Sequence, residues 1–86
     1  MIIKKKSWPE EFQATLNGSK KFDCRLFDFD CAVGDTLLLE EWDSSTKEYT
    51  GRTLEKKITY ILKTKEVAFW KEEDVNDKGF QIMSLE

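Results

Sequence analysis

The stretch SWPEEFQATLNGSKKFDCRLF, residues 7–27, predicts a short helix followed directly by a strand. Ser7 and Glu10 have the spacing of a capping box, and the proline between them stands where a helix tolerates a missing N–H. Gly18 is the residue type that most often takes the left-handed conformation just beyond a helix end. We therefore expect a helix over residues 8–17.

The spacing of apolar residues predicts which faces of these two elements are buried. Trp8, Phe12 and Leu16 recur every four residues, which places them on one face of the helix. Side chains of the strand that follows alternate between its two sides. We expect the core side of that strand to hold three apolar residues and the other side to hold an ion pair: Phe22, Cys24 and Leu26 inward, Asp23 and Arg25 opposite.

The remainder of the chain is predicted to be mostly β-structure. A first short strand starts at Ile2 and Ile3, and later strands are expected near residues 22–27, 36–42, 49–62 and 80–85. The long apolar run 54–62 suggests a central strand, with Tyr60 in the core. Residues 63–78 are expected to form a loop with one helical turn near AFWKEED.

The polar turn DSSTKE predicts a hairpin between two of these strands. Trp42 should pack across it from Tyr49, and Gly51 should mark a bulge in the return strand. One early helix with several closely spaced strands favours an α+β, mainly β fold. We expect a single domain over residues 1–86, built as a small mixed β-barrel of about five to six strands with one short N-terminal helix.

Composition excludes several kinds of chemistry. The 86 residues carry a net charge of −3, two cysteines and no histidine. Two cysteines without histidine do not complete a four-ligand zinc site, and the usual general base is missing. We expect no metal, no cofactor and no disulfide, with Cys24 and Cys31 as reduced thiols. No apolar run reaches the ~20 residues of a membrane span and no signal peptide is seen, so the expected location is the cytoplasm.

Four residues match the G-x-K-x-x-E-x-R signature of ASCH domains, with aspartate in place of glutamate: Gly18, Lys20, Asp23 and Arg25. The Val33-Gly34-Asp35 turn and the hairpin EEWDSSTKEYTGR follow in the order found in the short bacterial branch of those domains. The chain therefore resembles an ASCH domain of the PUA-like superfamily over nearly its whole length, residues 63–78 excepted. This resemblance implies a PUA-like β-barrel that binds RNA or nucleotides.

The same residues suggest a binding site. Asp23 and Arg25 are two apart and project from one face of a strand, so the carboxylate can orient the guanidinium toward a phosphate or a base edge. Lysines beside this pair add positive charge. With the resemblance, the candidate ligand-binding residues are Trp8, Lys20, Lys21, Asp23, Arg25 and, for stacking on a base, Trp70. The alternative from spacing alone is a structural ion pair flanked by solvated lysines.

Three functions fit these expectations, and binding is expected rather than catalysis. The first is a monomeric module that holds single-stranded RNA or a modified nucleotide in a cleft beside the helix, with a footprint limited by nearby acidic residues. The second, implied by the resemblance, is a small amidohydrolase acting on modified nucleosides. It would use Lys20 and Asp23 as catalytic residues, with Glu66 or Glu72 as a further carboxylate. The third is a protein-interaction adaptor. No membrane association is expected.

Overall fold

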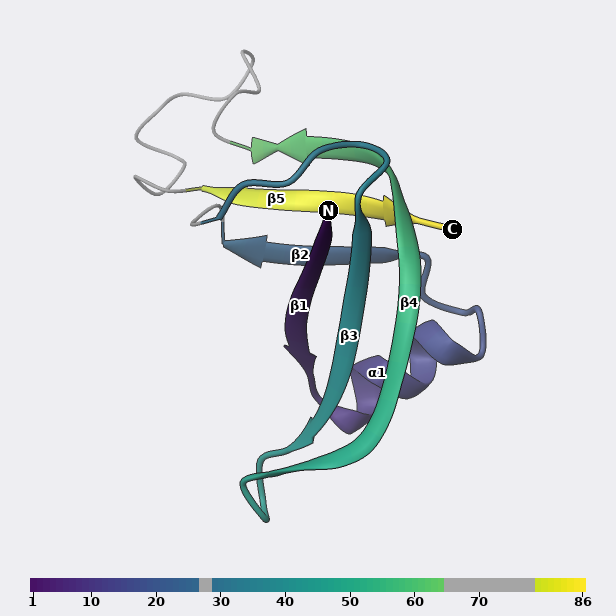
Figure 1. The fold of residues 1–86 in the computed structure, drawn as a ribbon, viewed down its shortest axis with the longest axis vertical. Coiled ribbons are helices and arrows are strands. Elements are labelled where there is room, and N and C mark those ends of the chain that lie inside the picture. Colours follow the sequence, from purple (N-terminus) through teal and green to yellow (C-terminus); the bar gives the residue numbers. More distant parts are fainter. Residues whose placement is uncertain (27–28, 65–78) are drawn as a thin grey trace.

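The computed structural model describes residues 1–26, 29–64 and 79–86. Within them the chain forms β1 (Ile2–Ser7), α1 (Pro9–Leu16), β2 (Phe22–Leu26), β3 (Thr36–Asp43), β4 (Glu48–Lys63) and β5 (Phe80–Leu85) (Figure 1). The predicted order of one strand, one helix and four strands is confirmed, and so is the α+β, mainly β class. The helical turn predicted near residues 68–74 lies outside the described residues.

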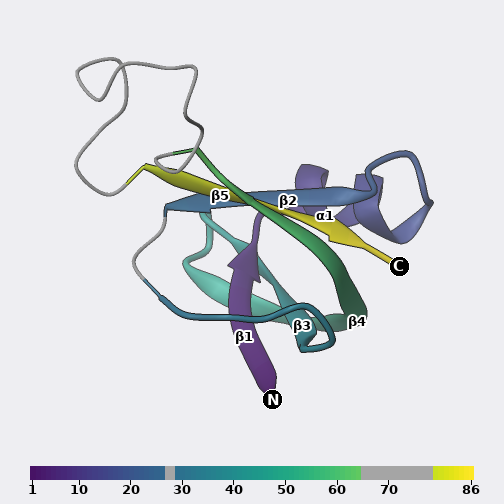
Figure 2. The same ribbon diagram turned by 90° about the horizontal axis from the view of Figure 1, so that it is seen from above.

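The strands form one sheet in the order β1-β3-β4-β5-β2. β1 pairs with β3 in parallel, and the other neighbours are antiparallel. β4 is the central strand, as predicted: up to Lys57 it pairs with β3, and from Ile58 it pairs with β5. Figure 2 shows β2 and β5 in one layer and β1 and β3 in another, while β4 curves from one layer into the other.

The sheet curves without closing into the predicted barrel. β1 and β2 are its two edges, and no ladder joins them in the described part of the chain. Closing a barrel requires each strand to run alongside the next with a consistent tilt and stagger. Here β2 runs across the direction of β1 (Figure 1), so these two edges cannot form a continuous ladder. We call the opening between β1 and β2 the seam.

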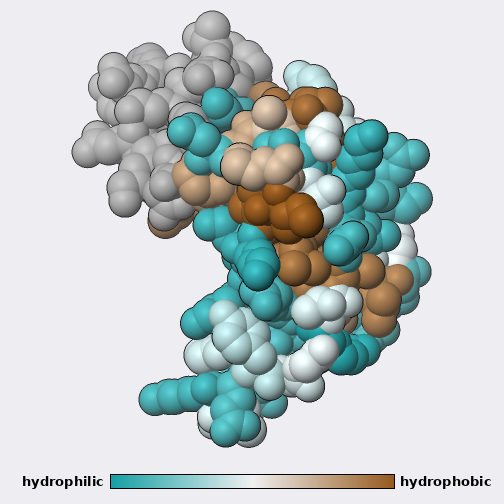
Figure 3. Space-filling model, viewed as in Figure 1, coloured by the Kyte–Doolittle hydropathy of each residue, from teal (hydrophilic) through white to brown (hydrophobic). Residues whose placement is uncertain are grey.

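The core lies between the two layers of the curved sheet. Its fully enclosed side chains come from α1 and three strands: Phe12, Leu37, Leu39, Ile58, Met83 and Leu85. Along β3 and β5 every second residue is buried, which is the period expected of strands with one face on a core. Apolar side chains also remain outside, and Figure 3 shows an apolar area framed by hydrophilic residues on the face seen in Figure 1.

Tyr60, predicted to be in the core, is 62% exposed. The register of β4 against β5 shifts between Ile58 and Tyr60. This irregularity interrupts the alternation, so that Ile58 and Ile61 face the core while Tyr60 faces outward. A pattern with a strict period of two does not reveal a one-residue bulge. The prediction therefore kept Tyr60 on the same side of the strand as Ile58.

The helix begins one residue later than predicted. Trp8 is its N-cap, with an extended backbone at φ −67° and ψ 152°, and Pro9 is the first helical residue. No side chain caps the N-terminus of the helix, so the predicted capping box does not form; Ser7 instead ends β1. Gly18 follows the helix with φ 85°, as expected for the residue that reverses the chain there.

The predicted burial of α1 is right only for Phe12. Phe12 and Thr15 are buried, whereas Trp8 is 62% exposed and Leu16 is also exposed. Trp8 lies outside the helix, so the helical period does not govern where its side chain points. The packed face instead follows the i, i+3 spacing from Phe12 to Thr15, and α1 rests on β3 through that face.

β2 faces the opposite way from the prediction. Phe22, Cys24 and Leu26 are exposed, while Asp23 is only 6% exposed and Arg25 is partly buried. The inner side of β2 looks into the seam, where a guanidinium finds hydrogen-bond acceptors. Alternation correctly placed the two sets on opposite sides but could not tell which side lies inward.

The β3–β4 hairpin carries both predicted features. Trp42 pairs with Tyr49. The next pair along the ladder is Glu40 with Thr53. Between these two pairs β3 contributes one residue, Glu41, whereas β4 contributes residues 50–52. This is a bulge, and Gly51 at its centre has φ 94°, a conformation that is strained for any other residue.

The bulge turns two side chains onto the buried carboxylate of Glu41. Arg52 donates from Nε and Nη2 to the two carboxylate oxygens, each at 2.9 Å, and Thr50 donates its hydroxyl at 2.6 Å. The guanidinium also lies 4.9 Å from the centre of the Phe12 ring and donates to Gln13 at 3.3 Å. This group, the Glu41 clamp, ties the middle of α1 to the hairpin.

Truncating Phe12 should show how much the fold depends on α1. Phe12 is 1% exposed, so we expect Phe12→Ala to lower the free energy of unfolding by about 3–5 kcal/mol. The matched control is Leu16→Ala, on the same helix but exposed, with an expected loss of less than about 1 kcal/mol. Urea unfolding followed by circular dichroism measures both. Equal losses would contradict the observed packing of the helix.

The Glu41 clamp predicts a pH dependence. Hydrogen bonds from Arg52 and, second, from Thr50 lower the pKa of Glu41 from its ordinary 4.5 to about 2. A carboxyl group whose pKa is lowered by folding stabilises the folded state. This stabilisation is complete above the pKa of the unfolded state, and it is lost as the pH falls through the pKa of the folded state. We therefore expect Glu41→Gln to lower the urea midpoint at neutral pH, and its difference from wild type to shrink between pH 4.5 and 2.

The exposed carboxylate of Glu55, on the same strand as Arg52, supplies the control. Glu55→Gln should change the urea midpoint little at any pH. A Glu41→Gln deficit that stayed constant down to pH 2 would mean that the carboxylate charge is not what the clamp uses.

Candidate functional site

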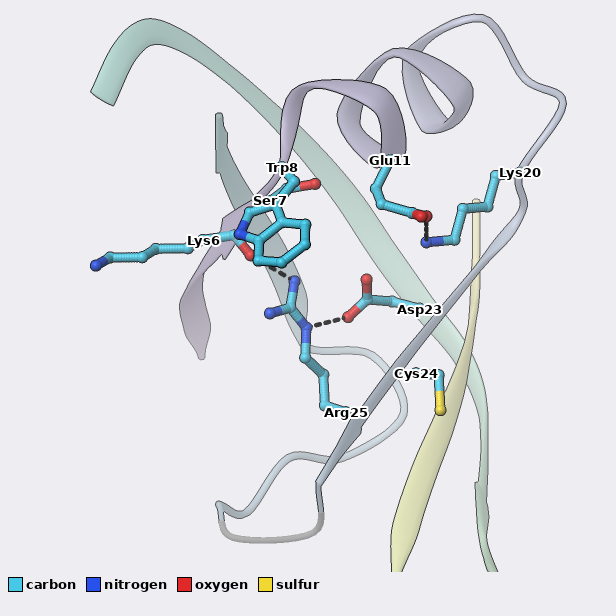
Figure 4. Close-up of a pocket in the computed structure, with 8 residues that line it drawn as sticks. All are labelled: Lys6, Ser7, Trp8, Glu11, Lys20, Asp23, Cys24 and Arg25. Atoms are coloured by element: carbon cyan, nitrogen blue, oxygen red, sulfur yellow. Dashed lines mark hydrogen bonds and ion pairs between the residues drawn. The ribbon is translucent and has the colours of Figure 1, made fainter. Parts of the chain in front are cut away.

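Arg25 bridges the seam. Its Nη2 donates to the backbone carbonyl of Lys6 on β1 at 2.7 Å, and its Nε donates to Asp23 Oδ2 at 2.6 Å (Figure 4). Asp23 is nearly enclosed, whereas the Arg25 side chain is 25% exposed. The guanidinium therefore joins two sheet edges that share no ladder, and the buried carboxylate holds it in the orientation this requires.

Lys20 is tied to the helix. Its Nζ donates to Glu11 Oε2 at 2.6 Å and lies 5.3 Å from the centre of the Phe22 ring. The bond to Lys20 lowers the pKa of the Glu11 carboxyl, and the lysine's charge adds to this. The backbone N–H of Lys20 donates to the carbonyl of Ala14, which anchors the turn after α1. The Lys20 ammonium is thus fixed in place.

The two ion pairs line one pocket of about 330 Å³, here called the seam pocket. It is bounded by the end of β1, the start of α1 and the inner side of β2, and its lining residues are Lys6, Ser7, Trp8, Glu11, Lys20, Asp23, Cys24 and Arg25. Trp8 follows β1 directly and stays largely exposed. Figure 4 shows it at the Arg25 end of the pocket, with the Lys20–Glu11 pair at the other end. The pocket therefore combines an aromatic face with fixed polar groups.

Four of the six predicted ligand-binding residues meet in this pocket: Trp8, Lys20, Asp23 and Arg25. Lys21 is not among its lining residues. It instead lines a second pocket of about 210 Å³, near the end of α1, together with Lys56 and Glu86. Trp70 lies outside the described residues, as do Glu66 and Glu72, the two further carboxylates of the hydrolase hypothesis.

Sequence reasoning missed four lining residues: Lys6, Ser7, Glu11 and Cys24. Glu11 is nine positions from Lys20, and only the return of the chain after the helix brings the two together. Lys6 contributes its carbonyl, which no side-chain pattern reveals. Two of these four left a trace in the sequence: Lys6 as one of three consecutive lysines, and Glu11 as an acidic residue in the first turn of a helix that precedes two lysines.

Charges in the seam pocket are balanced. Lys20 and Arg25 are each bonded to a carboxylate. The third cation, Lys6, points its side chain away from the other lining residues (Figure 4), and its Nζ lies 4.4 Å from the Trp42 ring centre. A pocket with paired charges suits a polar, nearly neutral group better than a row of phosphates.

The described residues show neither a candidate metal site nor a membrane-spanning helix. Among them, no group of three or more histidine, cysteine, aspartate and glutamate side chains is placed to hold a metal ion. None of the helices in that part of the chain is long and apolar enough to cross a membrane.

The two cysteines are free thiols in different surroundings. Cys24 is exposed on the outer side of β2. Cys31 is partly buried, with its Sγ 3.3 Å from Gln81 Oε1 and 3.9 Å from Met83 Sδ. Burial, followed by the nearby charge of Asp35, raises the pKa of the Cys31 thiol.

Fold and site together define a small, mainly β domain whose sheet stays open at one seam and holds a polar pocket there. The chain belongs to the family described as a domain of unknown function, DUF3850, whose model matches residues 3–83. This range contains the whole lining of the seam pocket. A comparison with curated proteins found no match.

The Asp23–Arg25 bridge should be measurable as a coupling free energy. We expect Arg25→Lys to lose the fork geometry and to destabilise the fold by about 1–3 kcal/mol, since Asp23 is left poorly paired in a buried place. Asp23→Asn should cost a similar amount. In a double-mutant cycle the two changes should be non-additive by about 1 kcal/mol or more. Additive losses would show that the two side chains do not act as a unit.

Thiol reactivity tests the orientation of β2. We expect a soluble aromatic disulfide reagent to modify Cys24 quickly and Cys31 slowly in the native protein, because only Cys24 is exposed and the pKa of Cys31 is raised. Cys24→Ser should remove the fast phase, and Cys31→Ser the slow one. If Cys24→Ser removed the slow phase instead, the apolar side of β2 would face the core.

Proposed function

We propose that this domain binds one nucleotide of single-stranded RNA, or a modified nucleotide, with the base in the seam pocket. The observation that carries the proposal is the exposed indole of Trp8 at the mouth of a pocket lined by fixed polar groups. A large aromatic side chain that is 62% exposed beside such a pocket offers a stacking surface for a planar ring. The resemblance to ASCH domains supports the same class of ligand.

The polar lining supplies directional contacts for a base. Arg25 uses Nε and Nη2 within the protein, and its Nη1 makes no hydrogen bond to a described residue. Lys20, held by Glu11, offers further donors, and Asp23 offers acceptors. Because each group is fixed by a neighbour, little side-chain entropy is lost when a ligand docks.

The balance of charge limits the footprint. The chain carries 17 acidic against 14 basic side chains, and the pocket cations are paired. A protein that neutralises many phosphates shows a steep fall of affinity with salt. Binding by this domain should instead depend weakly on salt and should favour a single nucleotide or a short strand over duplex nucleic acid.

One observation favours a second candidate, hydrolysis of an amide on a modified nucleoside. Glu11 accepts a hydrogen bond from Lys20 at 2.6 Å, and Asp23 lines the same pocket. A lysine between carboxylates could polarise a carbonyl while a carboxylate activates water. This candidate differs from the first in one outcome: an acylated nucleoside would be turned over, and Lys20→Gln would abolish the turnover.

The test of the proposed function is the binding of mononucleotides and short single-stranded RNA oligomers to Trp8→Ala. Losing a stacked base typically costs about 1–3 kcal/mol, so we expect affinity to fall roughly five- to hundredfold. Tyr60→Ala is the matched control, since Tyr60 is also 62% exposed but lies on β4 and does not line the pocket. Isothermal titration calorimetry gives the affinities.

Two results would overturn the proposal. One is that no nucleotide or RNA oligomer binds the wild-type protein at millimolar concentration. The other is that a nucleotide binds but Trp8→Ala and Tyr60→Ala bind it equally well, which would place the ligand away from the seam pocket.

A further inference from the structure

The open seam exposes backbone groups as well as side chains. The N–H of Leu85 donates to the carbonyl of Lys21 at 3.0 Å, which makes these two opposed residues a hydrogen-bonded pair. Hydrogen-bonded pairs alternate along an antiparallel ladder. Asp23 and Arg25 are therefore the β2 residues that bond to β5, through Met83 and Gln81.

The residues between them point their backbone groups the other way. The N–H and C=O of Phe22, Cys24 and Leu26 face the free edge of β2, toward the seam. Of these three only Cys24 lines the seam pocket. Its side chain is exposed on the outer side of β2 and is turned away from the Lys20–Glu11 pair (Figure 4). The part of Cys24 that the pocket meets is therefore its backbone.

On the opposite edge of the seam, one backbone group already has a side-chain partner. Arg25 donates to the carbonyl of Lys6, so this edge group of β1 has a partner. No hydrogen bond joins the N–H or C=O of Cys24 to another described residue across the seam. An unpaired edge is normally covered or blocked, because its N–H and C=O groups recruit partners. At Cys24 the edge instead opens into a pocket sized for a small ligand.

We propose that the backbone N–H and C=O of Cys24 read the Watson–Crick edge of the base in the seam pocket. This inference rests on the proposed function and names the class of ligand more closely. Each base carries a donor beside an acceptor on that edge, either a ring N–H beside a carbonyl or an amino group beside a ring nitrogen. One residue of an exposed strand edge offers the complementary acceptor and donor side by side.

The ligand class follows from this pairing. The base must be unpaired, because a duplex uses the same edge. Its Watson–Crick edge must also be unmodified, whereas changes at the sugar or at the outer carbon positions of the ring leave the pairing intact. Stacking on Trp8 tolerates any base, so the backbone of Cys24 supplies the discrimination that stacking lacks.

The first test uses the wild-type protein. The probes are uridine, cytidine, adenosine and guanosine monophosphates, each compared with its counterpart methylated at N3 (pyrimidines) or N1 (purines). We expect whichever nucleotide binds to lose about tenfold or more in affinity when its Watson–Crick nitrogen is methylated, because a hydrogen bond is lost and a methyl group meets the strand edge. Methylation at carbon 5 of the pyrimidines is the control and should be tolerated.

The second test removes the backbone donor. Proline is tolerated at an edge strand where its missing N–H faces away from the ladder, and position 24 is such a place. We expect Cys24→Pro to bind about tenfold more weakly than Cys24→Ala, which lacks the same thiol but keeps the N–H. Leu26→Pro, at an edge position that does not line the pocket, is the matched control and should keep the wild-type affinity. Thermal melts show whether each variant folds.

The outcomes separate this inference from the proposed function. If no nucleotide binds the wild-type protein, the proposed function fails and this inference with it. If a nucleotide binds, depends on Trp8 and tolerates methylation of its Watson–Crick nitrogen, the proposed function stands and the reading by Cys24 is wrong. If the folded Cys24→Pro and Cys24→Ala variants bound the nucleotide with equal affinity, the reading by Cys24 would also be wrong. A nucleotide weakened equally by Cys24→Pro and Leu26→Pro would also refute the reading by Cys24, because Leu26 does not line the pocket.

Discussion

The structure depends on one side chain that bridges a gap in its sheet. Arg25 reaches from β2 to the backbone carbonyl of Lys6 on β1, and the nearly buried carboxylate of Asp23 holds it there. The rigid, planar fork of donors lets one side chain bond a carboxylate and a carbonyl in fixed directions at once. Among the described residues no ladder joins the two edges, and this side-chain bridge links them instead. The space left between them is the seam pocket.

Much of the fold could be predicted from the sequence, because it follows from local patterns. The order of the strands followed from the alternation and the turns, and turn chemistry gave the pairing of Trp42 with Tyr49 and the bulge at Gly51. The patterns failed where tertiary contacts decide. Period two separates the sides of β2 but does not say which is inside, and the periodicity of α1 says nothing of Trp8, which lies just outside the helix. Closure of the barrel depends on the relative direction of β1 and β2, which no local pattern contains.

The candidate site was half predictable for a related reason. The spacing of Lys20, Asp23 and Arg25 reveals side chains that share a surface, and the structure does bring them together. Glu11 and the carbonyl of Lys6 became visible only when the chain was folded. Glu11 changes the chemistry, since it pairs Lys20 and, together with Asp23 on Arg25, leaves a polar pocket with little net charge where an anion site was expected. Local rules and fold disagree most at the seam, and such conflicts are typical of functional sites.

The central claim, that the open seam is where this domain binds, is tested most directly by nuclear magnetic resonance. The amide, indole and guanidinium N–H signals of the ¹⁵N-labelled protein are followed while each of the four nucleoside monophosphates is added. The account predicts shifts at the Trp8 indole, the Arg25 Nε–H and the Cys24 amide, with the amides of Tyr60 and Lys57 unmoved. Shifts that gather on other surfaces while these three signals stay in place would contradict it.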